Sequence, residues 1–393
     1  MSCAYLLIYN AHLYTPTGDW SPGWLLVEGQ TIRALGADLP PAFDASMPVH
    51  SIDAAGHALL PGFIDVHVHG AMGHEVMDAS PDGLRQMAQF YARHGVTSFL
   101  ATTWTASPQA ITAALNSLTQ LPGRIPGGAT ILGAHLEGPF LNPARCGAQD
   151  ARLIRRASRD EALPYLETGL VRLLAIAPEF PENLWLIDEC VCRGITVAAG
   201  HTDATYEQMQ TAVQHGLSQV THCFNAMSSF GHREPGAVGA ALSIPQLRCE
   251  LIADNIHVHP AAQKILVDAR QPQGVILITD AIRGAGLPDG DYPIDNRMVT
   301  IREGAVRLPD GALAGSVLTL ERALRNTRQA TGRSLSDIWI MSSLNAARAA
   351  GVSHRKGSLE TGKDADLVLL DQDFNVLLTV VEGQIAFQVA EIS

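Results

Sequence analysis

The chain has 393 residues, 47% of them hydrophobic, so it can bury a sizeable core as one large domain with an attachment or as two domains. Its formal charge of −12, with 27 Lys and Arg, argues against a nucleic-acid or anionic-membrane partner. The six cysteines form no CxxC pair, which is typical of reduced thiols. The N-terminus lacks a basic segment before its short, interrupted apolar run. We therefore expect a cytoplasmic protein without a signal peptide or membrane span.

The two ends of the chain share a β-rich pattern. Residues 1–60 contain short apolar runs separated by Gly, Pro and Asp. The stretch after Gly362 has two apolar runs, broken at residues 372–375, and a turn at Glu382-Gly383. We predict that residues 1–60 and 350–393 pair into one small β-sandwich domain.

The segment 61–349 alternates between helix and strand patterns. A helix that stops at a glycine and is followed by an apolar strand recurs at Gly95, Gly194 and Gly216. Asp82 is predicted to cap the first of these helices, and two closing helices are expected over 317–331 and 334–349. Eight apolar strands are expected at 61–68, 96–102, 130–136, 170–177, 195–201, 219–224, 248–254 and 274–280. With no GxGxxG after the first strand, this α/β pattern predicts a TIM-like (β/α)8 barrel rather than an open doubly wound sheet.

The first predicted strand ends in two histidines, His67 and His69, within the stretch PGFIDVHVHG. Because alternate side chains of a strand point the same way, this pair can bind one ion without a loop folding back. Catalytic residues of TIM barrels lie at the carboxyl ends of strands. Further candidates at those ends are His135, Glu137, His201, His222, Asp254, His257 and Asp280. Imidazole and carboxylate without thiolate suit one or two catalytic ions, Zn²⁺ first, with Fe²⁺, Mn²⁺ or Co²⁺ as alternatives.

The lysines narrow the choice of a bridging ligand. Many two-metal barrels bridge their ions with a carboxylated lysine, but this chain has only Lys264, Lys356 and Lys363. Lys264 falls inside a predicted helix, and the other two lie beyond the predicted barrel. A bridge between two ions would therefore be a plain carboxylate, and Glu137 is the best placed.

A series of motifs carries a resemblance to a known family. In chain order they are HxH, HLEGPFLNPxxxGAQ, AGHTDAT, THCFNAM, GHREPGAVGAAL, IADNIHVHP, ITDA and LAGS. From Pro61 to Ser316 the chain resembles the amidohydrolase superfamily and, within it, the N-acetylglucosamine-6-phosphate deacetylases. The resemblance implies a metal-dependent homodimer that hydrolyses the N-acetyl group of N-acetyl-D-glucosamine 6-phosphate. The products would be D-glucosamine 6-phosphate and acetate, in amino-sugar catabolism.

The resemblance also implies roles for individual residues. The metal always present in the family would be bound by Glu137, His201 and His222, and a second ion, found in some members, by His67 and His69. Asp280 would be the catalytic acid/base and is also a candidate metal ligand. The phosphate would be met by Asn225, Ala226 and Arg233, and the sugar by His257 and the backbone near Ala314. Some members have a histidine where this chain has Gln149, whose amide can still donate a hydrogen bond to the acetamide carbonyl.

Hydrolysis of an amide at such a site uses both a divalent ion and an acid/base residue. A divalent ion supplies an activated water and polarises the carbonyl, while Asp280 takes the water proton and returns it to the leaving amine. Three alternatives remain open at this point. They are a deacetylase for N-acetylgalactosamine 6-phosphate, a cyclic-amide or N-acyl amidohydrolase, and a non-catalytic barrel that serves as an interaction protein.

Overall fold

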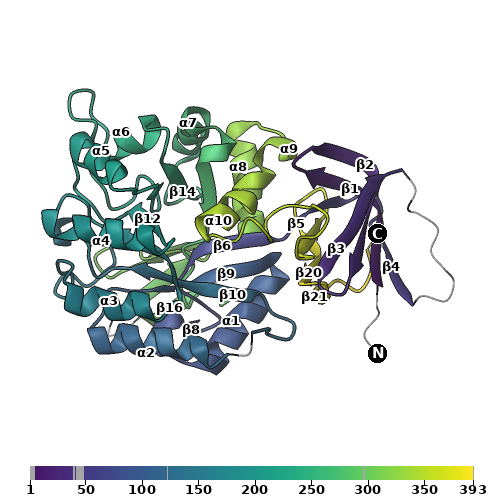
Figure 1. The fold of residues 1–393 in the computed structure, drawn as a ribbon, viewed down its shortest axis with the longest axis horizontal. Coiled ribbons are helices and arrows are strands. Elements are labelled where there is room, and N and C mark those ends of the chain that lie inside the picture. Colours follow the sequence, from purple (N-terminus) through teal and green to yellow (C-terminus); the bar gives the residue numbers. More distant parts are fainter. Residues whose placement is uncertain (1–4, 39, 41–47, 122, 295–296, 393) are drawn as a thin grey trace.

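The computed structural model describes residues 5–38, 40, 48–121, 123–294 and 297–392 of the chain. Residues 1–4, 39, 41–47 and 393, all within the predicted β-sandwich, lie outside this part. Among the described residues, no helix is long and apolar enough to span a membrane. Most strands belong to a terminal sheet or to a barrel, seen on the right and left of Figure 1.

The terminal sheet joins the two ends of the chain. Its strand order is β21-β20-β19-β5-β1-β2-β3, with β4 paired to β1. The ends meet where β5 and β19 run antiparallel, with Leu59 opposite Leu369. The sheet folds around an apolar core of its own that includes Ile8, Leu25 and Leu378. Its strands are β1 (Tyr5–Thr15), β2 (Gly18–Glu28), β3 (Thr31–Ala37), β4 (Val49–Asp53), β5 (Ala58–Pro61), β19 (Leu367–Leu370), β20 (Val376–Val381) and β21 (Gln384–Gln388).

The remaining large sheet is a barrel of eight parallel strands, in the order β15-β14-β13-β12-β11-β10-β9-β6. All eight predicted strands are present, and the expected TIM-like barrel with a separate β-domain is confirmed. The strands are nearly continuous apolar runs because both of their faces are buried. They are β6 (Phe63–Val68), β9 (Val96–Thr103), β10 (Thr130–Glu137), β11 (Val171–Ile176), β12 (Thr196–Ala199), β13 (Gln219–Val220), β14 (Arg248–Ile252) and β15 (Val275–Ile278).

Contacts between the first and last strands close the barrel. The hydroxyl of Thr279 donates to Asp65 Oδ2 at 2.6 Å, and the backbone N–H of Asp280 donates to the carbonyl of His67 at 2.9 Å. Asp65 and His67 lie on β6, whereas Thr279 and Asp280 follow β15. This seam therefore fixes two of the candidate site residues, His67 and Asp280, side by side.

Helices cover the outside of the barrel. The three predicted corner glycines, Gly95, Gly194 and Gly216, have φ values of 78°, 70° and 102°, which side chains rarely adopt. The helices are α1 (Pro81–Arg93), α2 (Pro108–Thr119), α3 (Arg159–Glu167), α4 (Pro181–Cys192), α5 (Tyr206–Gln214), α6 (Gly236–Ser243), α7 (Pro260–Arg270), α8 (Leu320–Thr331), α9 (Leu335–Ile338) and α10 (Leu344–Ala349). Short 3₁₀ turns are η1 (Val76–Asp78), η2 (Pro143–Arg145), η3 (Pro272–Gly274) and η4 (Trp339–Met341).

Two details of the helix prediction were wrong. Ser80, not Asp82, caps α1, because its side chain accepts a hydrogen bond from the Gly83 N–H and Pro81 occupies the first turn. The expected helix over 334–349 is broken into α9, η4 and α10. The hydroxyls of Ser342 and Ser343 both donate to the carbonyl of Trp339 and compete there with the helical hydrogen bond.

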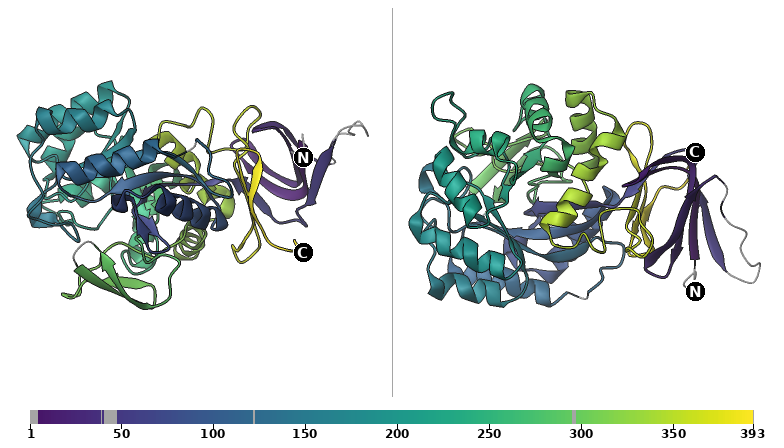
Figure 2. Two further views of the ribbon diagram at one scale, coloured as in Figure 1. Left: turned by 90° about the horizontal axis from the view of Figure 1, so that it is seen from below. Right: turned by 45° about the horizontal axis from the view of Figure 1, so that its top comes forward.

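An antiparallel hairpin after the last barrel strand was not predicted. It consists of β16 (Gly290–Ile294), β17 (Arg297–Arg302) and β18 (Ala305–Arg307), and Figure 2 shows it projecting from the barrel. Its apolar side chains Val299, Ile301 and Val306 pack with Trp104 and Ile282. A separate two-stranded turn, β7 (Gly70–Ala71) and β8 (His74–Glu75), follows the first barrel strand. The hairpin thus covers one side of the strand ends where the candidate site lies.

Candidate active site

Six polar side chains converge at the carboxyl ends of the barrel strands. They follow or end β6, β10, β12, β13 and β15 and form two groups of three. Within each group, the atoms that could bind a metal lie within 4.8 Å of one another, and all six residues are buried. The groups are His67, His69 and Asp280, and Glu137, His201 and His222.

The backbone is strained at three of these residues. His201, His222 and Asp280 have φ values of 47°, 29° and 50°, in the left-handed region that costs a residue with a side chain about 1–3 kcal/mol. Each of the three stands just beyond a barrel strand, where the chain turns away from the strand direction. Such strain persists only where surrounding contacts hold it, and it concentrates at functional sites.

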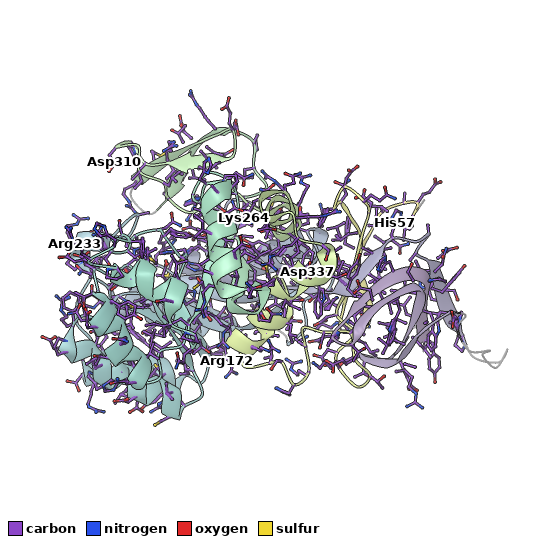
Figure 3. All side chains as sticks on the ribbon, turned by 90° about the horizontal axis from the view of Figure 1, so that it is seen from above. His57, Arg172, Arg233, Lys264, Asp310 and Asp337 are labelled. Atoms are coloured by element: carbon purple, nitrogen blue, oxygen red, sulfur yellow. The ribbon has the colours of Figure 1, made fainter. Side chains whose placement is uncertain are left out.

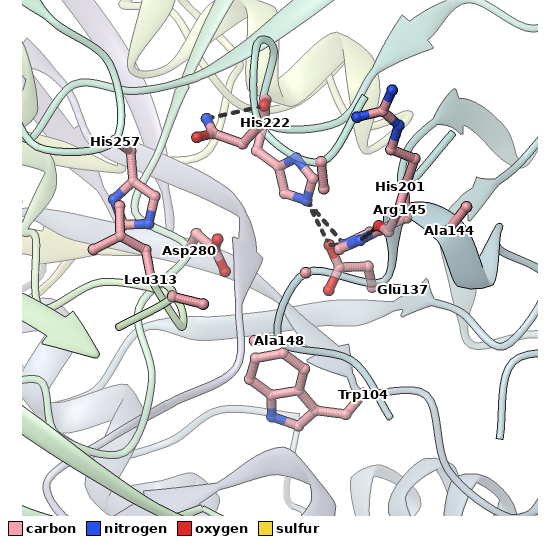
Figure 4. A pocket seen from close by; sticks show the side chains of 15 residues that line it. Trp104, Glu137, Ala144, Arg145, Ala148, His201, His222, His257, Asp280 and Leu313 are labelled. Atoms are coloured by element: carbon pink, nitrogen blue, oxygen red, sulfur yellow. Dashed lines mark hydrogen bonds and ion pairs between the residues drawn. The ribbon is translucent and has the colours of Figure 1, made fainter. Parts of the chain in front are cut away.

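Glu137 lies between the two groups. Its Oε1 is 3.3 Å from His201 Nε2, 3.1 Å from His222 Nε2 and 3.3 Å from His67 Nε2. Its Oε2 is 3.3 Å from His69 Nε2. Figure 4 shows Glu137, His201 and His222 facing Asp280 across the pocket. A carboxylate in this position can act as a ligand to an ion in either group.

The ring nitrogens of the histidines test whether a metal ion suits this arrangement. The Nε2 atoms of His201 and His222 are 3.1 Å apart, and those of His67 and His69 are 3.3 Å apart. The Nδ1 of His201 donates to the carbonyl of Arg145 at 2.9 Å, so its Nε2 presents a lone pair to the site. This lone pair faces Glu137 Oε1, 3.3 Å away, and two acceptors repel unless a cation binds both. The donor set therefore fits a divalent ion in each group.

Opposite charges shift the pKa values of the site in opposite directions. Burial raises the pKa of Glu137, but the neighbouring imidazoles, His67 above all, lower it to well below its ordinary value. Burial also raises the pKa of Asp280, and the imidazoles of His67 and His69 hold it below the ordinary value. Conversely, burial lowers the pKa of His67, but Glu137 and Asp280 raise it well above the usual range. Both carboxylates are thus ionised at neutral pH.

A cavity of about 370 Å³ opens above the two groups. Asn225, Ala226 and His257, which the sequence predicts as substrate-binding residues, line it. Figure 4 shows His257 beside Asp280 at one side of the pocket. His257 Nδ1 donates to Asp254 Oδ2 at 2.6 Å. Burial lowers the pKa of His257, but Asp254 raises it above the ordinary value, so a cationic form is favoured beside the pocket.

The other three predicted substrate-binding residues do not line this cavity. Gln149 is buried, and its Nε2 donates to Glu137 Oε2 at 2.6 Å. Ala314 is buried between Leu313 and Gly315, which do line the cavity. Arg233 lines a neighbouring cavity, and Figure 3 shows it at the outer edge of the molecule.

Comparisons with known proteins identify the family of the chain. Residues 58–386 match the model of the Amidohydrolase family, and this segment contains all six residues of the two groups. The chain belongs to the amidohydrolase family. It is 42% identical over 338 residues to the Bacillus subtilis N-acetylglucosamine-6-phosphate deacetylase, covering 85% of each chain. An N-acetylgalactosamine-6-phosphate deacetylase of Escherichia coli O157:H7 is 39% identical, with 86% of this chain and 90% of that protein covered.

A solved structure supports the same relationship. A variant of the Mycobacterium smegmatis N-acetyl-D-glucosamine-6-phosphate deacetylase, in complex with N-acetyl-D-glucosamine-6-phosphate, superposes on this amidohydrolase with a TM-score of 0.91. The sequence identity is 31%, and the match covers 98% of this chain and 100% of that one. The barrel and the terminal sheet are therefore both shared with that structure.

Sequence reasoning missed three residues of this amidohydrolase site. Trp104 stacks on His69 with ring centroids 3.9 Å apart, and Arg145 lines the pocket while its Nε donates to Asp203 at 2.8 Å. The third is Glu250, whose Oε2 lies 3.0 Å from His67 Nδ1. Trp104 directly follows β9, so the strand-end rule used for the histidines could have found it. Glu250 is a charged residue inside an apolar strand, and this pattern could also have identified it from the sequence.

Proposed function

We propose that this amidohydrolase hydrolyses the N-acetyl group of N-acetyl-D-glucosamine 6-phosphate to D-glucosamine 6-phosphate and acetate. The observation that carries the proposal is the convergence of Glu137, His201 and His222 on one side of the pocket and Asp280 on the other. The protein is thus a hydrolase acting on a linear amide. Its relatives with that activity match this chain over most of its length.

The metal ion of this enzyme is proposed to be Zn²⁺, with Fe²⁺, Mn²⁺ or Co²⁺ as alternatives that suit the same ligands. Glu137, His201 and His222 would hold the first ion, and His67, His69 and Asp280 the second. A divalent ion here supplies Lewis-acid polarisation of the amide carbonyl and lowers the pKa of water. The short contacts of Glu137 with both groups support its role as the shared ligand.

Asp280 is proposed as the residue that moves the proton. Asp280 is 8% exposed and lines the pocket. Burial raises the pKa of its carboxyl, but His67 and His69 hold that pKa below the ordinary value. It can therefore accept a proton from water during attack on the acetyl carbon. Asp280 then donates that proton to the sugar amine, because an amine leaves only when protonated.

Polar and cationic groups support a phosphorylated substrate. Asn225 and Ala226 line the pocket on the loop after β13, and Arg145 adds a guanidinium to the same cavity. Arg145 also lines the neighbouring cavity that contains Arg233. Guanidinium groups bind phosphate through paired hydrogen bonds. We assign the phosphate to the end of the pocket formed by these residues. The sugar would contact His257 and the backbone near Ala314, and the acetamide carbonyl would lie near Gln149.

The compartment and the oligomeric state of the enzyme are proposed from its cysteines and from the position of Arg233. The described cysteines Cys146, Cys190, Cys192, Cys223 and Cys249 are free thiols, which supports a reducing compartment such as the cytoplasm. A homodimer is proposed because Arg233 lies outside the catalytic pocket of its own chain and could reach that of a second copy.

A second candidate substrate is the galacto epimer, N-acetylgalactosamine 6-phosphate. It is favoured by the 39% identity to the Escherichia coli enzyme of that name. The two sugars differ in the configuration of one hydroxyl, so one hydrogen bond in the pocket decides between them.

The test is acetate release by the purified protein with Zn²⁺ present. N-acetylglucosamine 6-phosphate, its galacto epimer and unphosphorylated N-acetylglucosamine are compared side by side. We expect the fastest release from the gluco phosphate and much slower release from the unphosphorylated sugar. Faster release from the galacto phosphate would favour the second candidate. Release from none of the three, with bound metal confirmed, would contradict the proposed activity.

A further inference from the structure

A third carboxylate adjoins both metal-capable groups. Glu250 stands in the middle of β14, and its side chain is fully buried inside the barrel. A carboxylate at this depth is strongly unfavourable unless hydrogen bonds replace its lost hydration. The roles proposed above for the pocket and for proton transfer do not involve Glu250.

The hydrogen bonds of Glu250 account for both of its oxygens. Oε2 accepts from His67 Nδ1 at 3.0 Å and from the backbone N–H of His222 at 3.2 Å. Oε1 accepts from Gln219 Nε2 at 2.6 Å. One carboxylate that does not line the pocket therefore contacts a member of each metal-capable group.

The contact with His67 determines which ring nitrogen is available. A hydrogen on Nδ1 is held by Glu250, so the lone pair lies on Nε2, which faces His69 and Asp280. We propose that Glu250 is a positioning residue for the ion held by His67, His69 and Asp280. This inference rests on the proposed second metal site.

The other group is oriented differently. His201 gives its Nδ1 hydrogen to the backbone carbonyl of Arg145, which no side-chain substitution removes. His222 meets Glu250 only through its backbone N–H, while its imidazole makes its contacts with Glu137 and His201. Loss of the Glu250 carboxylate should therefore weaken the second ion far more than the first.

The test measures metal content and affinity rather than turnover. Glu250→Leu keeps the approximate volume of the side chain but leaves His67 Nδ1 without an acceptor. Metal-free wild type and variant are titrated with Co²⁺, and the bound ions are counted by elemental analysis and followed by the visible spectrum. We expect two ions in the wild type. In the variant the second ion should bind about 10–100-fold more weakly, with the first retained.

Two further variants separate this role from a general disturbance of the core. In Glu250→Gln the new amide oxygen can still accept from His67, and its NH₂ group then faces Gln219. Gln219 Oε1, which has no hydrogen-bond partner among the described residues, can accept from this NH₂ group after the Gln219 amide rotates. The charge alone is then lost, and we expect about a tenfold weaker second ion. Gln219→Leu removes the hydrogen bond to Glu250 Oε1 and leaves His67 and the His222 N–H paired with Oε2, so both ions should remain. If Glu250→Leu does not fold, Glu250→Gln decides.

The outcomes distinguish the inference from the site on which it rests. If Glu250→Leu binds two ions with unchanged affinity, the positioning role of Glu250 is wrong, but the second metal site still stands. If only Glu250→Gln folds, the same result in that variant leads to the same conclusion. A wild type that binds a single ion would overturn the second metal site and the inference with it. Equal weakening of both ions would also overturn it, because a positioning role through His67 predicts a selective effect.

Discussion

The side-chain amide of Gln149 joins the backbone N–H of Thr105 to the carboxylate of Glu137. Gln149 Oε1 accepts from Thr105 N at 2.7 Å, and Gln149 Nε2 donates to Glu137 Oε2 at 2.6 Å. Because a backbone N–H can only donate, Thr105 fixes which end of the amide faces Glu137. Glu137 Oε1 is thereby left to His201 and His222. Gln149 thus orients the carboxylate that lies between the two metal-capable groups.

Replacing Gln149 with leucine should weaken the metal site. The variant loses the hydrogen bond that orients Glu137, so we expect the affinity for the first ion to fall about 10–100-fold and kcat to fall with it. Metal titration of the metal-free protein measures this directly. Gln149→His is the matched control, because an imidazole N–H can donate to Glu137 and restore the affinity. Unchanged metal affinity combined with a raised KM would instead assign Gln149 to the acetamide alone.

Asp280→Asn should remove turnover while the first ion stays bound. An amide cannot accept the proton of the attacking water, so we expect kcat to fall by about 10³-fold or more. The Glu137, His201 and His222 ligands are untouched, and elemental analysis should still find their ion. Near-normal turnover in this variant would exclude Asp280 from proton transfer. Loss of all metal would show that Asp280 acts first as a ligand.

The pair of His257 and Asp254 predicts a pH dependence of substrate binding. Burial lowers the pKa of His257, but Asp254 raises it above the ordinary value, with Asp280 adding to and Arg307 opposing the rise. The cationic form is therefore present below this raised pKa and is lost as the pH increases through it. We expect KM for the phosphorylated sugar to rise on the alkaline side, by at most about tenfold per pH unit.

Asp254→Asn tests the sign of this effect. Without the carboxylate the pKa of His257 falls, so the rise of KM should begin at a lower pH than in the wild type. His257→Gln cannot titrate and should give a KM that is higher but lacks this pH dependence. Identical pH profiles for wild type and both variants would show that His257 does not bind the substrate as a cation.

The barrel could be predicted because its signals are local. Each strand is an apolar run, and Gly95, Gly194 and Gly216 mark the corners where helices hand over to strands. The histidines of the site were predicted by one rule, that catalytic residues of such barrels lie at the carboxyl ends of the strands. The contact between His67 and Glu250 could not be predicted, since it joins residues 183 apart in sequence through the register of the barrel. The hairpin of β16 to β18 was missed because its apolar residues are few and interrupted by Pro, Asp and Gly.

The position of Arg233 separates two ways of binding the phosphate. Within one chain it lines the cavity next to the catalytic pocket, together with Arg145, and does not line the pocket itself. We expect Arg233→Ala to raise KM for the phosphorylated sugar about tenfold or more, because a charge-assisted hydrogen bond is lost. The KM for the unphosphorylated sugar should be unchanged. An equal rise for both sugars would remove Arg233 from phosphate recognition.

Mixing two variants with different defects shows which chain supplies Arg233. Arg233→Ala lacks the guanidinium but keeps Asp280, whereas Asp280→Asn lacks the proton acceptor but keeps Arg233. In a mixed dimer, a site with its own Asp280 and the guanidinium of the second copy is complete only if Arg233 acts across the interface. We expect co-refolded variants to recover efficient turnover at low substrate concentration, which neither variant shows alone. Without any recovery in mixed dimers of verified composition, Arg233 would act within its own chain, through movement of its loop toward the pocket.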